Sequence, residues 1–112
     1  EDDGSMFEDE ALDQVSLFDL IGAFQKVLQQ RKKVTIHRVQ EIAVSLEERL
    51  DYVQKQLQER GELEFSELFL KTDTRMVMIV TFIAILELIR RRMLHAVQEI
   101  NFAAIKLKLA DG

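Results

Sequence analysis

The stretch from Thr74 to Met93, TRMVMIVTFIAILELIRRRM, is apolar on two sides when it is drawn as an α-helix. At about 100° per residue, its apolar side chains fall mainly into two stripes on nearly opposite faces. One stripe comprises Met78, Ile79, Phe82, Leu86, Ile89 and Met93. The other comprises Val77, Val80, Ala84 and Leu88. Between them lie Thr81, Ile83, Ile85, Glu87, Arg90 and Arg92. Because a surface helix needs only one apolar stripe, we expect this helix to be buried from two sides, the second by another protein.

Two other interpretations of this stretch are a membrane span and a helix central to a small domain. A membrane span is disfavoured, because the apolar run from Met76 to Leu86 is interrupted by Thr81 and is far shorter than the ~18 residues needed. Glu87 and three arginines follow closely. A helix that is simply central to a small domain stays open as the alternative to a partner-binding helix.

Composition limits the classes of protein. The chain has 112 residues, enough for one domain and one extra element, and its 47% apolar content excludes disorder throughout. It has no cysteine, which fits a reduced cytoplasmic setting, and no secretory signal is visible. The net charge is −5, with −8 on residues 1–74 and +3 on residues 75–112. This acidic balance disfavours tight, non-specific DNA binding, although the basic C-terminal part keeps a weaker form of it open.

Three segments are predicted along the chain. Residues 1–15 are acidic and aperiodic and are expected to be a flexible lead-in, in which Gly4-Ser5-Met6 is typical of a cloning remnant. Residues 16–33 form an amphipathic helix that Ser16 and Asp19 begin. Its apolar stripe comprises Leu17, Leu20, Ile21, Phe24, Val27 and Leu28. Residues 40–110 form the main domain.

Within the main domain, the signals alternate between helix and strand. After an extended or linker segment at 34–39, a capping box at Ser45 and Glu48 begins a helix that presents Leu46, Leu50, Val53 and Leu57, and Gly61 ends it. Then come a short strand at 63–65, a short helix at 67–71 and the long helix, capped by Thr72 or Asp73. Strands at 94–98 and 104–109, joined by a turn at 99–102, complete the order. This order predicts an α+β, mostly helical fold: a C-terminal winged-helix domain preceded by an amphipathic helix.

Catalytic chemistry has no sequence signature here. The phosphate-binding loop, the dinucleotide-binding glycines and the nucleophile elbow are all missing, and His37 and His95 each stand alone. We therefore expect no enzyme, cofactor, metal or small-molecule ligand. A DNA-binding winged helix is the alternative function, with phosphate contacts from residues 90–92, Lys106 and Lys108. It is disfavoured because the first turns of the long helix, after Arg75, carry apolar side chains that cannot read base edges.

The ordered set of residues resembles a known family. The features that carry the resemblance are Phe65, the triplet 67–69 (ELF), Arg75, the run 81–88 (TFIAILEL), Gln98, Phe102 and Ile105. The helix at 16–31, which contains the sequences Leu-Phe-Asp-Leu (17–20) and Ala-Phe (23–24), looks like the segment that precedes the C-terminal domain in the same family. Over residues 16–109 the chain is similar to the bacterial kleisins of the ScpA (segregation and condensation protein A) family. It departs from them at Ala103-Ala104, where the family often has Gly-Asp, and it looks like the C-terminal part of a longer protein.

The resemblance implies a non-enzymatic role in a cytoplasmic, nucleoid-associated SMC–ScpA–ScpB condensin complex. The C-terminal domain would dock on the SMC ATPase head and close the ring that condenses and segregates chromosomes, touching DNA only through the complex and no membrane. The implied head-binding residues are Phe82, Leu86, Ile89 and Met93, and the implied ScpB-binding residues are Leu17, Leu20, Ile21 and Phe24. Phe82→Arg or Leu86→Arg is expected to abolish head binding and to leave the fold intact. A homodimer of the isolated fragment through the same apolar face is a further alternative.

Overall fold

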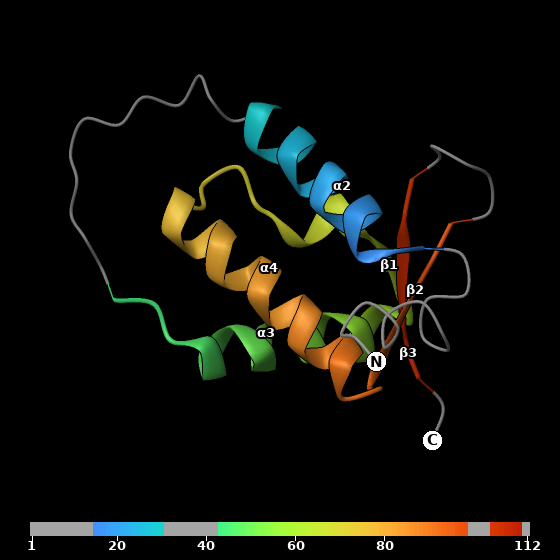
Figure 1. Cartoon of the computed structure of the whole chain (residues 1–112). Coiled ribbons are helices and arrows are strands. Elements are labelled where there is room, and N and C mark those ends of the chain that lie inside the picture. The colour runs from blue at the N-terminus through green and yellow to red at the C-terminus, as the bar shows by residue number, and fades with distance from the viewer. Residues whose placement is uncertain (1–14, 31–42, 99–103, 111–112) are drawn as a thin grey trace.

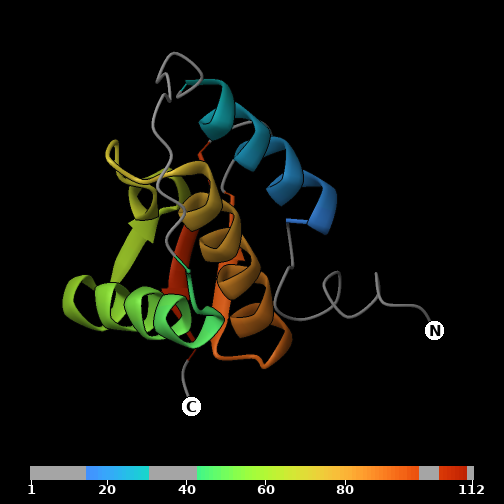
Figure 2. The ribbon, with the colours of Figure 1, turned by 90° about the vertical axis from the view of Figure 1, so that its left-hand side faces the viewer.

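A computed structural model describes residues 15–30, 43–98 and 104–110. Its helices are α2 (Leu17–Gln30), α3 (Leu46–Arg60), the short 3₁₀ helix η1 (Phe65–Leu68) and α4 (Arg75–Arg90). Its strands are β1 (Glu62–Glu64), β2 (Leu94–Val97) and β3 (Lys106–Leu109). In Figures 1 and 2, α4 lies between α2 and α3, and the sheet lies beside the helices. The described chain is therefore α+β and mostly helical, as the sequence predicts.

Side-chain caps begin the helices close to the predicted positions. Ser45 caps α3 by accepting a hydrogen bond from the Glu48 N–H at 3.1 Å, as predicted, and Gly61 ends α3 with φ of 83°. The cap of α4 is Thr74, whose Oγ1 accepts from the Val77 N–H at 3.2 Å. The predicted caps of α4, Thr72 and Asp73, were wrong because the Asp73 carboxylate is engaged in the preceding turn, where it accepts from the Leu70 N–H at 2.9 Å.

The three strands form one antiparallel sheet in the order β1-β3-β2. The half-buried pattern predicted for the last strand is confirmed: Leu107 is fully buried, while Lys106 and Lys108 point to solvent. Both lysines approach the Glu62 carboxylate, at 3.7 and 3.8 Å. The short helix predicted at 67–71 is instead η1, because Phe65 and Leu68 turn into the core. The segment at 34–39 and the turn at 99–102 lie outside the described residues.

Helix α4 is buried along one continuous arc rather than along two opposite stripes. Its buried side chains are Met78, Thr81, Phe82, Ala84, Ile85, Leu88 and Ile89. The arc includes Thr81 and Ile85, which the sequence pattern placed between the stripes. The reason is packing geometry: α3 and α2 cover neighbouring sides of α4, so the core lies between them and the opposite arc stays open.

Helix α2 shares the core of the rest of the described chain. Val15, Leu20, Phe24 and Val27 are buried in the same cluster as the side chains of α3, α4 and the sheet. Its central contact is Phe24, whose ring stacks on Phe82 with centroids 4.4 Å apart and planes 5° from parallel. Phe65 and Phe69 complete what we call the aromatic cluster, Phe24, Phe65, Phe69 and Phe82. Each such pair adds about 0.5–1.5 kcal/mol beyond burial.

One buried polar contact joins α3 to α4. The Thr81 side chain is fully buried, and its hydroxyl donates to the Val77 carbonyl at 2.7 Å while accepting from Arg49 Nε at 3.0 Å. The Arg49 guanidinium also lies 4.1 Å from the centre of the Tyr52 ring. The Tyr52 hydroxyl in turn donates to the Leu68 carbonyl at 3.0 Å, so this network links α3, α4 and η1.

Thr81→Val is expected to lower the free energy of unfolding by about 1 kcal/mol or more, because it keeps the shape of the side chain but removes the acceptor of Arg49. Urea denaturation followed by circular dichroism measures the change. Arg49→Met should be destabilising by itself, and the Thr81→Val effect should shrink in that background. Fully additive losses in the double variant would contradict this account of the contact.

Candidate functional site

The open arc of α4 carries exposed apolar side chains in one line along the helix. Met76 is 54% exposed, Ile79 36% and Ile83 46%, and half-buried Leu86 borders them. We call Met76, Ile79, Ile83 and Leu86 the open face of α4. Their spacing of three and four residues places them on one side of the helix. Soluble monomers rarely expose contiguous apolar surface of this kind, so the open face is a candidate docking site for another protein.

The four residues expected to bind the SMC head are not together on the surface. Leu86 is half-buried at the edge of the open face, and Met93 is 38% exposed beyond the end of α4. Phe82 is only 9% exposed and Ile89 only 2%, so the expectation that both lie on a free surface is wrong. Phe82 is covered by α2, and Ile89 faces the core on the same arc. Whether any of the four contacts the head stays a prediction.

The open face includes three residues that the sequence analysis did not assign to a partner, Met76, Ile79 and Ile83. The periodicity of α4 was too apolar all round to separate them from the core. Thr81 offered one usable signal. It lies nearly opposite Ile83 on the helix, and its hydroxyl accepts a hydrogen bond from Arg49 of α3, so the Thr81 side faces the core and the Ile83 side faces solvent.

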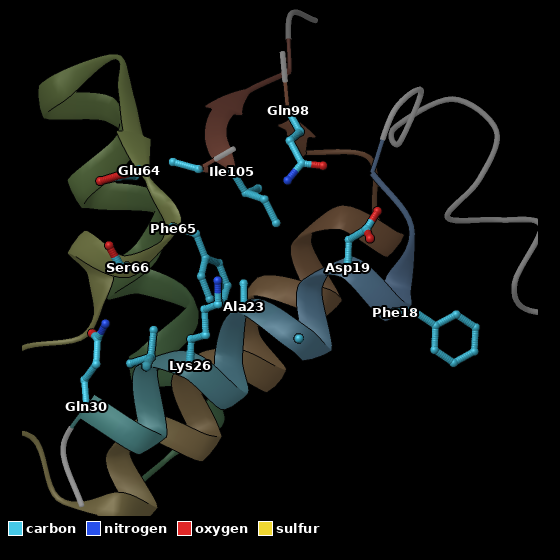
Figure 3. A pocket seen from close by; sticks show the side chains of 13 residues that line it. Phe18, Asp19, Ala23, Lys26, Gln30, Glu64, Phe65, Ser66, Gln98 and Ile105 are labelled. Atoms are coloured by element: carbon cyan, nitrogen blue, oxygen red, sulfur yellow. The ribbon is translucent and has the colours of Figure 1, made fainter. Parts of the chain in front are cut away.

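The residues expected to bind ScpB are divided by the structure. Leu20 is fully buried and Phe24 is 8% exposed, both against the rest of the chain. Ile21 is 36% exposed and Leu17 half-buried. Phe18, which the sequence analysis did not choose, is 79% exposed and points away from the helix (Figure 3). An accessible α2 surface therefore consists of Leu17, Phe18 and Ile21.

A small ion-pair network lies at the C-terminal end of the open face. Glu87 accepts hydrogen bonds from Arg90 Nη2 at 2.7 Å and from Arg91 Nε at 2.8 Å. Hydrogen bonds from Arg90 first, and then from Arg91, lower the pKa of Glu87 from its ordinary value to about 2. The carboxylate thereby holds both arginines beside the last turn of α4.

Glu87 is expected to stabilise the helix end at neutral pH and to lose this effect in acid. Its pKa in the folded chain, about 2, is below its unfolded value of about 4.5. The contribution is therefore present above pH ~4.5 and is lost as the pH falls toward ~2. Glu87→Gln should flatten the pH dependence of urea denaturation between these limits. An unchanged slope in the variant would show that Glu87 is not coupled to folding.

A cavity of about 680 Å³ opens on the other side of α2, between this helix, η1 and the ends of β2 and β3 (Figure 3). Its described lining mixes apolar and charged side chains: Phe18, Asp19, Gly22, Ala23, Lys26, Val27, Gln30, Glu64, Phe65, Ser66, Gln98, Ala104 and Ile105. Asp19, Lys26 and Glu64 supply the charge. These described lining residues form no convergent set of catalytic groups, so we assign no reaction to this cavity.

Two findings concern metals and membranes. Among residues 15–30, 43–98 and 104–110, no group of three or more His, Cys, Asp or Glu side chains could hold a metal ion. His95 lies half-buried on β2, and His37 is outside the described ranges. Within those ranges, too, no helix has the length and apolar character that crossing a membrane requires.

Comparison with known proteins places this arrangement in a family. The family model described as "Segregation and condensation protein ScpA" matches residues 6–110. Curated proteins named "Segregation and condensation protein A" from Bacillus cereus (strain AH820), Bacillus anthracis (strain A0248) and Bacillus thuringiensis subsp. konkukian (strain 97-27) are each 36% identical over 94 residues. The matches cover 81% of this chain and 38% of each relative, so the chain spans well under half the length of the curated relatives it matches. The family model and the relatives agree, and the chain belongs to the ScpA family of segregation and condensation proteins.

Proposed function

We propose that this chain is the C-terminal part of the kleisin subunit of a bacterial SMC–ScpA–ScpB condensin complex. Its role is to dock on the ATPase head of an SMC subunit and so help close the ring that condenses and segregates chromosomes on the nucleoid. In this proposal the domain catalyses no reaction and binds no small-molecule ligand. Membership in the ScpA family supports the kleisin role.

The element order of the main domain supports a winged helix as the docking unit. From residue 46 the order is helix, strand, short helix, helix, strand, strand, and the three strands make one small antiparallel sheet. In this scheme α4 is the helix before the wing, and β2 and β3 are the wing strands. A helix in that position is normally presented outward, which fits the exposure of Met76 and Ile83.

The observation that carries the proposal is the open face of α4. The buried arc supplies the core, whereas Ile79 and Ile83 leave apolar surface exposed to solvent that packing within the described chain does not use. Apolar anchors at the centre of such a contact supply most of the binding energy. The Glu87 carboxylate with its two arginines forms a charged rim that orients the partner. The proposed head contact therefore comprises the open face, with Met93 at its end.

The accessible surface of α2 is proposed to contact ScpB. Phe18 and Ile21 lie one turn apart and are exposed, and Leu17 borders them. An exposed aromatic side chain is a typical interface anchor. This surface retains two of the four residues that the sequence analysis assigned to ScpB, Leu17 and Ile21, and adds Phe18.

Direct DNA binding is less well supported. Both wing lysines lie beside the Glu62 carboxylate, and Arg90 and Arg91 lie beside Glu87. These carboxylates reduce the positive potential that phosphate binding requires. The exposed first turns of α4 present Met76 and Ile79, which offer no hydrogen bonds to base edges.

Mixing the full chain with the SMC head of the same organism tests the proposal. Size-exclusion chromatography should show a stoichiometric complex of the chain with the head. In a separate pull-down, the chain should retain duplex DNA only weakly and should release it at moderate salt. Strong DNA retention without head binding would favour the DNA-binding alternative. A concentration-dependent dimer that excludes the head would assign the open face to a second copy of the chain.

A further inference from the structure

The two sets of residues expected to bind different partners cover each other in this structure. Phe24, from the set assigned to ScpB, stacks on Phe82, from the set assigned to the SMC head, at 4.4 Å. Phe82 lies directly beside the open face, since it is three residues from Ile79 and four from Leu86 on the helix. Without α2, the open face would therefore extend across Phe82. Helix α2 now occupies that extension.

The surface on which α2 packs, which we call its seat, is apolar and is bordered by a cavity on one side. The hydrogen bonds of Ser16 and Asp19 are reciprocal, at 3.0 and 3.2 Å, and stay within the first turn of the helix. The buried side chains of α2 are Leu20, Phe24 and Val27, and Val15 just before the helix is buried in the same cluster. The Phe24 ring contacts Phe82 of α4 and Phe69, which follows η1. On the other side of the helix, the cavity of about 680 Å³ separates α2 from the end of the sheet. A helix seated through apolar side chains beside a cavity is less firmly fixed than α3, which packs on α4 and the sheet and is also hydrogen-bonded to α4 by Arg49 and to η1 by Tyr52.

We propose that α2 is a displaceable cover over the Phe82 edge of the head-docking face, and that full engagement of the SMC head requires α2 to leave this seat. The inference rests on the proposed function, because it concerns access to the same face of α4. In the covered state, only the open face and Met93 are accessible to the head. In the uncovered state, Phe82 joins Ile79 and Leu86 in one wider apolar surface.

The cover couples head binding to the binding of a protein that contacts the row Leu20, Phe24 and Val27 of α2. When α2 leaves its seat, Phe24 and Leu20 become accessible at the same moment as Phe82. A protein that binds the apolar row of α2 therefore favours the state that the head also binds, and by linkage each partner raises the affinity of the other. Head affinity measured for this chain alone is lowered by the fraction of molecules in which α2 is seated.

Tethering α2 tests the cover directly. The chain has no cysteine, so Lys26→Cys and Ser66→Cys give a unique pair that a short flexible bis-maleimide can join. Both residues are exposed and line the cavity side of α2, so the tether lies away from Ile79 and Ile83. The matched control pair is Asp51→Cys with Lys55→Cys, two exposed positions one turn apart on α3, where a tether constrains nothing. Phe24→Ala, which loosens the seat, is the opposite perturbation.

Titration of each variant of this chain with the SMC head should separate the outcomes. We expect the Lys26–Ser66 tether to weaken head binding at least about tenfold, and Phe24→Ala to strengthen it several-fold, since the two change the uncovered fraction in opposite directions. The control tether and the untethered cysteine pair should bind as the unmodified chain does. Equal affinity for tethered and untethered protein would overturn the cover and leave the proposed function standing. No binding by any variant, including the unmodified chain, would overturn both.

Discussion

Phe82→Arg is expected to lower the free energy of unfolding by at least about 3 kcal/mol and to release α2 from the rest of the domain. Truncating a buried phenylalanine costs about 3–5 kcal/mol by itself. Arginine adds an unpaired charge beside Phe24 and Phe65, whose ring centroids lie 4.4 and 6.0 Å from that of Phe82. Because small domains are stable by only about 5–15 kcal/mol, the loss is a large fraction of the total. Urea denaturation followed by far-ultraviolet circular dichroism measures it.

Two variants separate burial from other effects at this position. Phe82→Leu keeps an apolar side chain and should cost much less, because it introduces no charge. Ile83→Arg places the same charge on the adjacent residue, which is 46% exposed, and should change stability by no more than about 0.5 kcal/mol. If Phe82→Arg proved as harmless as Ile83→Arg, Phe82 would be a surface residue and the seat of α2 described above would be wrong.

Local chemistry explains why most elements were predictable. Ser45 with Glu48, Gly61 and the alternation of Lys106 to Lys108 each act through their own backbone neighbourhood, so sequence spacing is enough to recognise them. The predicted cap of α4 was wrong because local spacing does not distinguish three adjacent capping residues. Thr72, Asp73 and Thr74 are all good capping residues, and only the turn at Leu70, which engages Asp73, decides among them.

The candidate site depends on how segments distant in the sequence pack together, and the periodicity of apolar residues does not predict that packing. Helix α4 is apolar at nearly every position from Met76 to Leu86, so its pattern gives no contrast between core and surface. The direction of the core is set by α3, through Arg49 on Thr81, and by α2, through Phe24 on Phe82. The resemblance to kleisins pointed to α4 as the docking element, and this assignment stays a proposal. It did not include α2 as a cover, so Phe82 was placed on the surface.

Ile83→Arg is expected to weaken binding of the SMC head at least about 30-fold while leaving the domain folded. Ile83 is exposed at the centre of the open face, with Ile79 and Leu86 on either side along the helix. A charge placed there would have to be desolvated inside an apolar contact, and central anchors of interfaces cost about 2 kcal/mol or more when they are lost. Titration calorimetry with the head measures affinity, and circular dichroism verifies the fold.

Leu70→Arg is the matched control for this prediction, because Leu70 is 48% exposed but lies in the turn before α4 rather than on the open face. The two substitutions add the same charge to equally exposed apolar positions, so a general electrostatic effect on head binding would affect both. Loss of binding in Ile83→Arg alone assigns the contact to the open face. Loss in Leu70→Arg alone would move the contact to the turn that precedes α4. Retention in both would leave the exposed side chains of α4 without a partner in the SMC head and would contradict the proposed docking surface.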